Sequence, residues 1–150
     1  MRYSRELING FIIFALIAVY FLILEALGFS DVFILRIVNM AFVAYGIHRT
    51  IKGNYESGVR GYNKHFLSAI ITSMFGAVLS IVGLMIYIEI RGGEAYLETL
   101  AYSFLFGGGR ATIPQYCFGL FIESSAASFI GSFVMMQYWK DKIEVINQVD

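Results

Sequence analysis

The chain has 150 residues, enough for one domain over 1–150, and 58% of them are hydrophobic while only 15% are charged. This composition excludes an ordinary soluble surface and predicts an integral membrane protein. The 11 basic and 11 acidic residues cancel, which argues against a nucleic-acid partner. A lone Cys117 cannot form an internal disulfide, and no Cys/His cluster has metal-ligand spacing, so we expect neither metal nor cofactor.

Four apolar runs, each near the length that crosses a bilayer, divide the chain at about 8–29, 32–51, 66–90 and 116–138. The first run is longer than the apolar core of a signal peptide and lacks a small-x-small cleavage site. We therefore predict an all-α integral membrane fold, an antiparallel four-helix transmembrane bundle in up-down-up-down order.

Basic residues set the expected orientation. They precede the first run, crowd the second connection and follow the fourth run, whereas the first and third connections carry no such excess. Because cytoplasmic loops are enriched in Lys and Arg, both termini are predicted to be cytoplasmic. His48 and His65 flank the second connection, and we interpret them as polar boundary residues because no third metal ligand accompanies them.

The third connection contains its own helical pattern. Apolar residues recur at spacings of three and four near 94–106, while Glu94 and Glu98 occupy the other side. We expect a short amphipathic helix on the outer membrane surface. Three glycines at 107–109 then provide a hinge, and Pro114 marks the entry to the last helix.

Charged and amide side chains inside the apolar runs indicate where function could reside. Asn39 and Glu123 both fall roughly 10 Å below the outer boundary, counting about 1.5 Å per residue. Arg36 and Glu25 lie about one turn from that boundary. A buried guanidinium needs a partner, and either carboxylate could supply it, although Glu25 could equally snorkel to the headgroups. We predict an intramembrane polar cluster of Glu25, Arg36, Asn39 and Glu123.

Small residues recur four apart on the third and fourth runs, a pattern typical of close helix packing. The third run contributes one such strip and the fourth run two neighbouring strips, one of which includes Glu123. The members are Ser68, Thr72, Gly76 and Ser80, then Gly119, Ala127 and Gly131, then Ser124, Ser128 and Ser132. We expect the third and fourth helices to form the tightest pair.

Three segments carry a resemblance to a known family: INGFIIFALIAVYFLILEALG, the long stretch 48–90, and FGLFIESSAASFIGSFVMMQYWKDK. The chain resembles an uncharacterised family of four-helix bacterial membrane proteins, a domain of unknown function common in Bacteroidota. Gly61, Tyr62 and Phe66 are similar to the step that family members show before their third helix. The resemblance implies a multi-pass protein of the bacterial cytoplasmic membrane. That family has no established activity or catalytic residues.

Three functions remain open at this point. The first is a non-enzymatic subunit or scaffold that self-associates or joins a larger membrane complex through its packing strips. The second is an oligomeric channel or transporter component with Glu123 in a polar path. The third is a lipid-binding or lipid-modifying protein, but Ser124 and Ser125 beside Glu123 lack a histidine at comparable depth. We therefore expect no catalytic residues, and lipid and other membrane subunits as partners.

Overall fold

A computed structural model describes residues 4–30, 32–100 and 112–143, apart from the side chain of Phe33. All regular structure in these residues is helical. The elements are α1 (Ser4–Leu27), the 3-10 helix η1 (Phe33–Ile37), α2 (Val38–Glu56), α3 (Tyr62–Arg91), α4 (Glu94–Leu100) and α5 (Ile113–Ile143). Each predicted apolar run coincides with a long helix, but the start of the second run forms η1, so that α2 begins only at Val38, and all four helices extend beyond their runs at one end or both.

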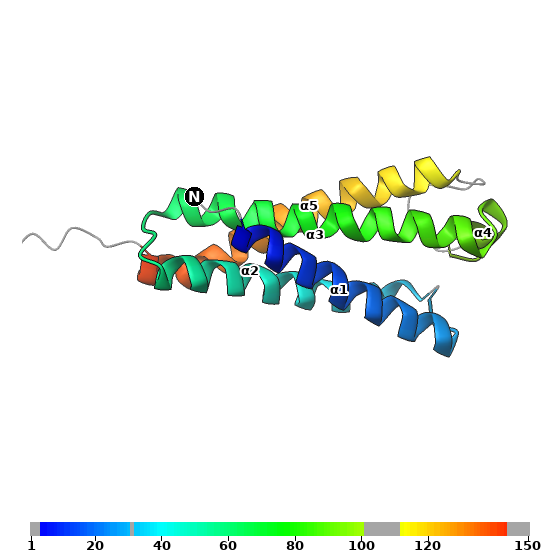
Figure 1. Cartoon of the computed structure of the whole chain (residues 1–150), viewed down its shortest axis with the longest axis horizontal. Coiled ribbons are helices and arrows are strands. Elements are labelled where there is room, and N and C mark those ends of the chain that lie inside the picture. Colours follow the sequence, from blue (N-terminus) through cyan, green and yellow to red (C-terminus); the bar gives the residue numbers. More distant parts are fainter. Residues whose placement is uncertain (1–3, 31, 101–111, 144–150) are drawn as a thin grey trace, which may run out of the picture.

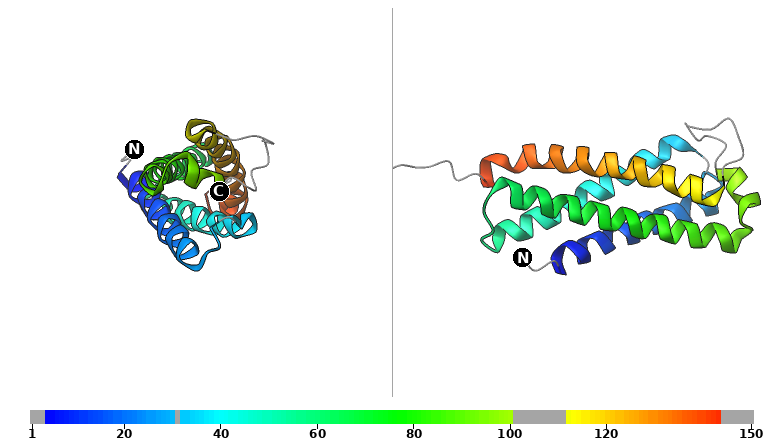
Figure 2. Two further views of the ribbon diagram at one scale, coloured as in Figure 1. Left: turned by 90° about the vertical axis from the view of Figure 1, so that its right-hand side faces the viewer. Right: turned by 90° about the horizontal axis from the view of Figure 1, so that it is seen from above.

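The four long helices α1, α2, α3 and α5 lie side by side and alternate in direction (Figures 1 and 2). One end carries the link between α2 and α3 together with Arg49, Lys52, Lys64 and Lys140, and we call it the basic end. The other end carries η1 and α4, and we call it the α4 end.

Glycines in the left-handed region end α1 and α2. Gly28 has φ 75° and Gly58 has φ 80°, a conformation that residues with a Cβ rarely adopt. After α1, the amide of Phe29 donates to the carbonyl of Leu24 at 2.8 Å, and after α2 the amide of Val59 donates to Asn54 at 3.0 Å. These Schellman motifs satisfy the last helical carbonyls and turn the chain back along the bundle.

Three helices, α1, α3 and α5, are long and apolar enough to cross a membrane. Large apolar side chains such as Phe11, Val19, Ile86 and Phe133 are exposed on their outer faces, where acyl chains would cover them. The fourth expected span, α2, does not reach the same hydropathy, because it carries Asn39, His48, Arg49, Lys52, Asn54 and Glu56.

Apolar side chains form a separate core at each end of the bundle. The basic end buries Ile47, Ile51, Ala69, Met136, Trp139 and Ile143. The α4 end buries Ile88, Leu97, Leu100, Ile113, Tyr116 and Cys117. The short helix predicted near 94–106 is confirmed over Glu94–Leu100, and two of its leucines pack onto the bundle, while residues 101–106 of that prediction lie outside the described part.

The closest helix pair is α1 and α3, which corrects the expectation that the third and fourth apolar runs pack most tightly. A Cβ added at Gly10 would lie 2.9 Å from the Thr72 carbonyl oxygen, and one at Gly76 would lie 3.0 Å from the Gly10 carbonyl oxygen. Ile13, fully buried, fills the space beside Gly46 of α2. The small strip of α3 therefore admits α1, because Gly10 lets the two backbones touch.

Candidate functional site

A groove of about 690 Å³ opens in the half of the bundle nearer the α4 end, and we call it the α5 groove. All four long helices line it, mostly through apolar side chains such as Phe21, Leu84 and Leu120. Its polar lining includes Ser80, Ser124 and Ser128. An apolar groove with a few polar groups is the usual form of a ligand or partner site.

Arg36, Asn39 and Glu123, three members of the predicted polar cluster, all line this groove. Arg36 Nη2 donates to the hydroxyl oxygen of Tyr116 at 3.0 Å, and the Tyr116 side chain is 1% exposed. Within the described residues the side-chain oxygen of Asn39 is buried without a hydrogen-bond partner. Such a group costs free energy inside a fold.

Glu123 is exposed, which corrects the expectation that it is set into a buried packing surface. Ala126 and Ile130, at three and seven residues further along α5, are exposed with it. Glu123 thus lines the α5 groove at a point where its side chain is open to the surroundings of the bundle. Gly119, Ala127 and Gly131 of its strip are partly buried, and Ser128 and Ser132 are buried.

Glu25 has a different partner from the one predicted. Its carboxylate accepts from Arg91 Nη2 at 3.1 Å, at the end of α3, rather than joining the groove. The Arg91 guanidinium also lies 5.5 Å from the centre of the Tyr96 ring. Burial, and then the neighbouring Glu25 carboxylate, raise the pKa of the Tyr96 phenol. Glu25 and Arg91 therefore form a boundary ion pair that fastens α1 to the end of α3.

A second polar constellation lies inside the basic end, and sequence reasoning missed it. The Glu6 carboxylate is 2% exposed and accepts at Oε1 from the Ser68 hydroxyl at 2.8 Å and from Asn54 Nδ2 at 3.4 Å. The other oxygen, Oε2, is buried without a hydrogen-bond partner in the described structure. We call Glu6, Asn54 and Ser68, together with Asn9, Thr50 and Thr72, the Glu6 network.

The Glu6 network continues toward the middle of the bundle. Asn9 Nδ2 donates to Thr50 Oγ1 at 2.9 Å, and Thr50 and Thr72 share a hydroxyl hydrogen bond of 2.9 Å. Thr72 in turn donates to the backbone carbonyl of Ser68 at 2.8 Å. Polar residues at spacings of three and four on three helices could have signalled this network.

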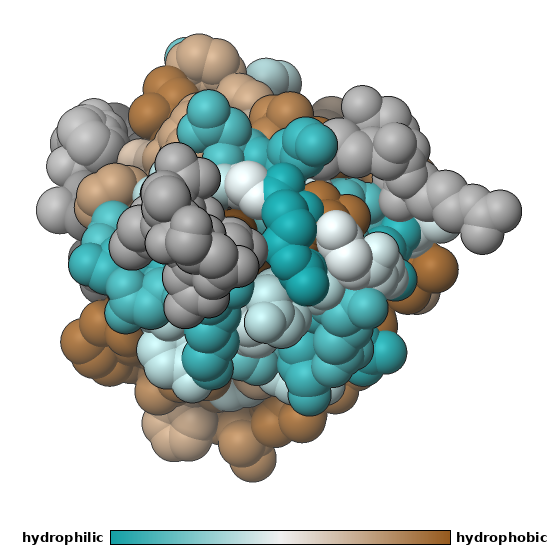
Figure 3. Space-filling view, turned by 90° about the vertical axis from the view of Figure 1, so that its left-hand side faces the viewer, coloured by the Kyte–Doolittle hydropathy of each residue, from teal (hydrophilic) through white to brown (hydrophobic). Residues whose placement is uncertain are grey.

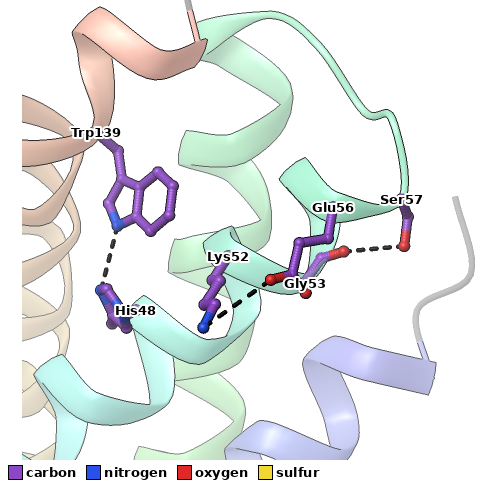
Figure 4. A network of polar contacts seen from close by, with 6 residues as sticks. All are labelled: His48, Lys52, Gly53, Glu56, Ser57 and Trp139. Atoms are coloured by element: carbon purple, nitrogen blue, oxygen red, sulfur yellow. Dashed lines mark hydrogen bonds and ion pairs between the residues drawn. The ribbon is translucent and has the colours of Figure 1, made fainter.

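Aromatic and charged groups surround the network at the basic end. Trp139 of α5 donates through Nε1 to His48 Nδ1 of α2 at 3.2 Å, while Lys52 and Glu56 pair at 3.9 Å along α2 (Figure 4). His65 is fully buried rather than at a boundary, and its Nε2 lies 3.0 Å from the Val59 carbonyl oxygen. The described residues contain no group of three or more His, Cys, Asp or Glu that could hold a metal ion.

Comparison with known proteins adds no relative. No family model matches the sequence, and neither a curated protein nor a solved structure is significantly similar to it. The resemblance to an uncharacterised four-helix bacterial family therefore stays a prediction that rests on the three quoted segments.

Proposed function

We propose that this chain is a four-span protein of a bacterial cytoplasmic membrane with the basic end on the cytoplasmic side. Arg5, Arg49, Lys52, Arg60, Lys64, Lys140 and Lys142 lie at the basic end, whereas Arg36 and Arg91 lie at the α4 end. This asymmetry supports the orientation. The fourth span is α2, whose inward polar groups Thr50 and Asn54 are satisfied by the Glu6 network and so cost little inside a bundle.

Within that membrane the protein acts as a non-enzymatic subunit that receives an apolar partner helix along α5 and its groove. The exposed position of Glu123 carries this proposal. A carboxylate facing acyl chains costs about 2.5 to 3.5 kcal/mol at the centre of a span. A partner that covers Glu123 with a basic or hydrogen-bonding side chain removes that cost, and exposed Phe129, Ile130 and Phe133 supply the apolar contact around it.

The partner is a second copy of this chain or another membrane subunit. Either must present a donor at the depth of Glu123, because an exposed carboxylate only accepts hydrogen bonds. Polar side chains of this kind stabilise helix association in membranes through interhelical hydrogen bonds, because no water competes for them.

A transport component is the second candidate, favoured by the short distance along α1 between the α5 groove and a second groove at the basic end. On α1, Asn9 lines a groove at the basic end and Phe14 lines the α5 groove, with Ile13 packed on Gly46 between them. Five residues of helix correspond to about 7.5 Å, far less than the hydrocarbon thickness of about 30 Å. A proton or ion that passed from one groove to the other would have to cross only this short packed segment around Ile13.

Purification of the full chain from its membrane in mild detergent tests the first proposal. Wild type is expected to elute as a complex, and Glu123→Leu and Glu123→Gln to release the partner. Glu89→Gln, at an exposed carboxylate on α3, is the matched control and should keep the complex. A complex that survives both Glu123 substitutions contradicts the subunit proposal. Proton or ion flux through wild-type vesicles that Glu123→Gln abolishes would favour transport instead.

A further inference from the structure

We propose that the groove at the basic end, the basic-end groove, binds a phosphate group. It has a volume of about 730 Å³ and lies between the first turns of α1 and the last turns of α2. Three cations, Arg5, Arg49 and Lys52, line it against one carboxylate, Glu56, which leaves a formal charge of +2. Figure 3 looks onto this end of the molecule, where hydrophilic residues gather and hydrophobic ones flank them.

Arg5 is held in place by the fold, unlike an ordinary surface arginine. Its Nη1 donates to Asn54 Oδ1 at 2.9 Å and its Nη2 donates to Ser57 Oγ at 2.8 Å. Ser57 is itself fixed by donation to the Gly53 carbonyl at 2.9 Å (Figure 4). Because the side chain is already ordered, an anion that binds it loses less conformational entropy.

Gly53 makes room for this arrangement. A Cβ added there would lie 3.0 Å from both Cδ and Nε of Arg5 and 3.2 Å from its Cζ. The Arg5 side chain therefore rests against the backbone of α2, and an added Cβ would oblige it to shift by a few tenths of an ångström. Asn54, the neighbour of Gly53, links Arg5 to the buried Glu6.

Arg49 and Lys52 complete the site as exposed cations. Both are exposed, and Lys52 reaches Glu56 only at 3.9 Å, so both remain available to an anion. Other basic residues at this end are engaged elsewhere. Arg60 donates to the carbonyls of Tyr55 and Val59, and Lys142 lies 5.0 Å from the Trp139 ring centre.

A phosphate suits these groups because guanidinium and ammonium donors bind its oxygens through charge-assisted hydrogen bonds. The phosphate could belong to an anionic lipid headgroup or to a free phosphate. This site is independent of the partner surface on α5, so either proposal can fail without the other.

The test uses the full chain in nanodiscs. Thermal unfolding and native mass spectrometry are compared in phosphatidylcholine alone, in phosphatidylcholine mixed with phosphatidylglycerol, and in phosphatidylcholine with added inorganic phosphate. Stabilisation and retained lipid only with phosphatidylglycerol assign the site to a headgroup, whereas stabilisation by inorganic phosphate assigns it to a free phosphate. If neither stabilises the protein, the proposal is overturned.

Two variants and a control separate a built site from general positive charge. Arg5→Gln should weaken binding of the stabilising probe about tenfold or more. Gly53→Ala keeps every charge but crowds the Arg5 side chain, and should weaken binding less than Arg5→Gln does. Lys140→Gln removes an exposed charge at the same end outside the groove and should change affinity less than about twofold. Equal losses for Arg5→Gln and Lys140→Gln, or a larger loss for Gly53→Ala than for Arg5→Gln, would reject the site.

Discussion

The two halves of this bundle treat polar groups in opposite ways. Toward the basic end, Asn9, Thr50 and Thr72 are buried and bonded to one another, and glycines bring α1 and α3 into backbone contact. Toward the α4 end, Glu123 is exposed and a groove separates the helices. One half uses its polar residues to hold the helices together, while the other leaves polar residues open to something outside the chain.

This difference identifies which half of the bundle can accommodate a binding partner. A packed layer whose side chains hydrogen-bond across three helices has one arrangement, since any shift breaks several contacts at once. A groove lined by an exposed carboxylate gains from a partner that covers it. Substitutions of polar residues in the two halves should therefore change the free energy of unfolding by amounts that differ in sign as well as in size.

The largest effect is expected at the contact between α1 and α3. Gly10→Val places a branched side chain where a Cβ alone would lie 2.8 Å from Phe75 Cδ1, and should lower the free energy of unfolding by about 3 kcal/mol. Titration with sodium dodecyl sulfate in mixed micelles measures it. Gly131→Ala is the control, because the nearest atom to its added Cβ, Ile47 Cδ1, is 3.9 Å away. Equal losses in both variants would refute the tight pair.

The next effect concerns the Glu6 network. Glu6→Ala removes the acceptor for Ser68 and Asn54 and should cost about 2 kcal/mol of unfolding free energy in the same assay. Glu56→Ala removes an exposed carboxylate of α2 outside the network and should leave the free energy of unfolding nearly unchanged. A Glu6 variant as stable as wild type would show that the network does not stabilise the fold.

A smaller effect of opposite sign is expected in the other half. Glu123→Leu replaces an exposed carboxylate by an apolar side chain and should leave the free energy of unfolding of the isolated chain unchanged or raise it by about 1 kcal/mol. The same titration compares it with Glu6→Ala. Marked destabilisation by Glu123→Leu would mean that this carboxylate holds the chain's own helices together.

The smallest effect is expected at the boundary ion pair. Glu25→Gln weakens the contact with Arg91, whose side chain is half exposed, and the free energy of unfolding should barely change. Far-ultraviolet circular dichroism during heating would check this. A large drop in the melting temperature would contradict this expectation and would mean that the ion pair with the half-exposed Arg91 stabilises the fold.

Sequence patterns located the helices well because Gly and Pro mark their ends and apolar runs fix their lengths. Depth counting also placed Arg36, Asn39 and Glu123 at levels that share one groove. Depth does not give the direction in which a side chain points, so the sequence predicts Glu25 in the polar cluster with Arg36, whereas it pairs with Arg91.

Other features depend on contacts that one helix does not reveal. The strip on α3 fits any helix with small residues, and the choice of α1 rests on a single Gly10. Glu6 was overlooked because a carboxylate next to Arg5 at the start of an apolar run resembles a solvated flank. Only the approach of Ser68 and Asn54 from two other helices explains its burial.

Site-specific photo-crosslinking in native membranes tests the central claim most directly. A photoreactive residue replaces Ile122, beside Glu123 on α5, or Val82 on α3; these side chains are 55% and 49% exposed. A partner on the α5 face should give a discrete protein adduct at position 122 that Glu123→Leu removes, and only lipid adducts at position 82. Lipid adducts alone at both positions would contradict the claim that the Glu123 face is covered by another helix.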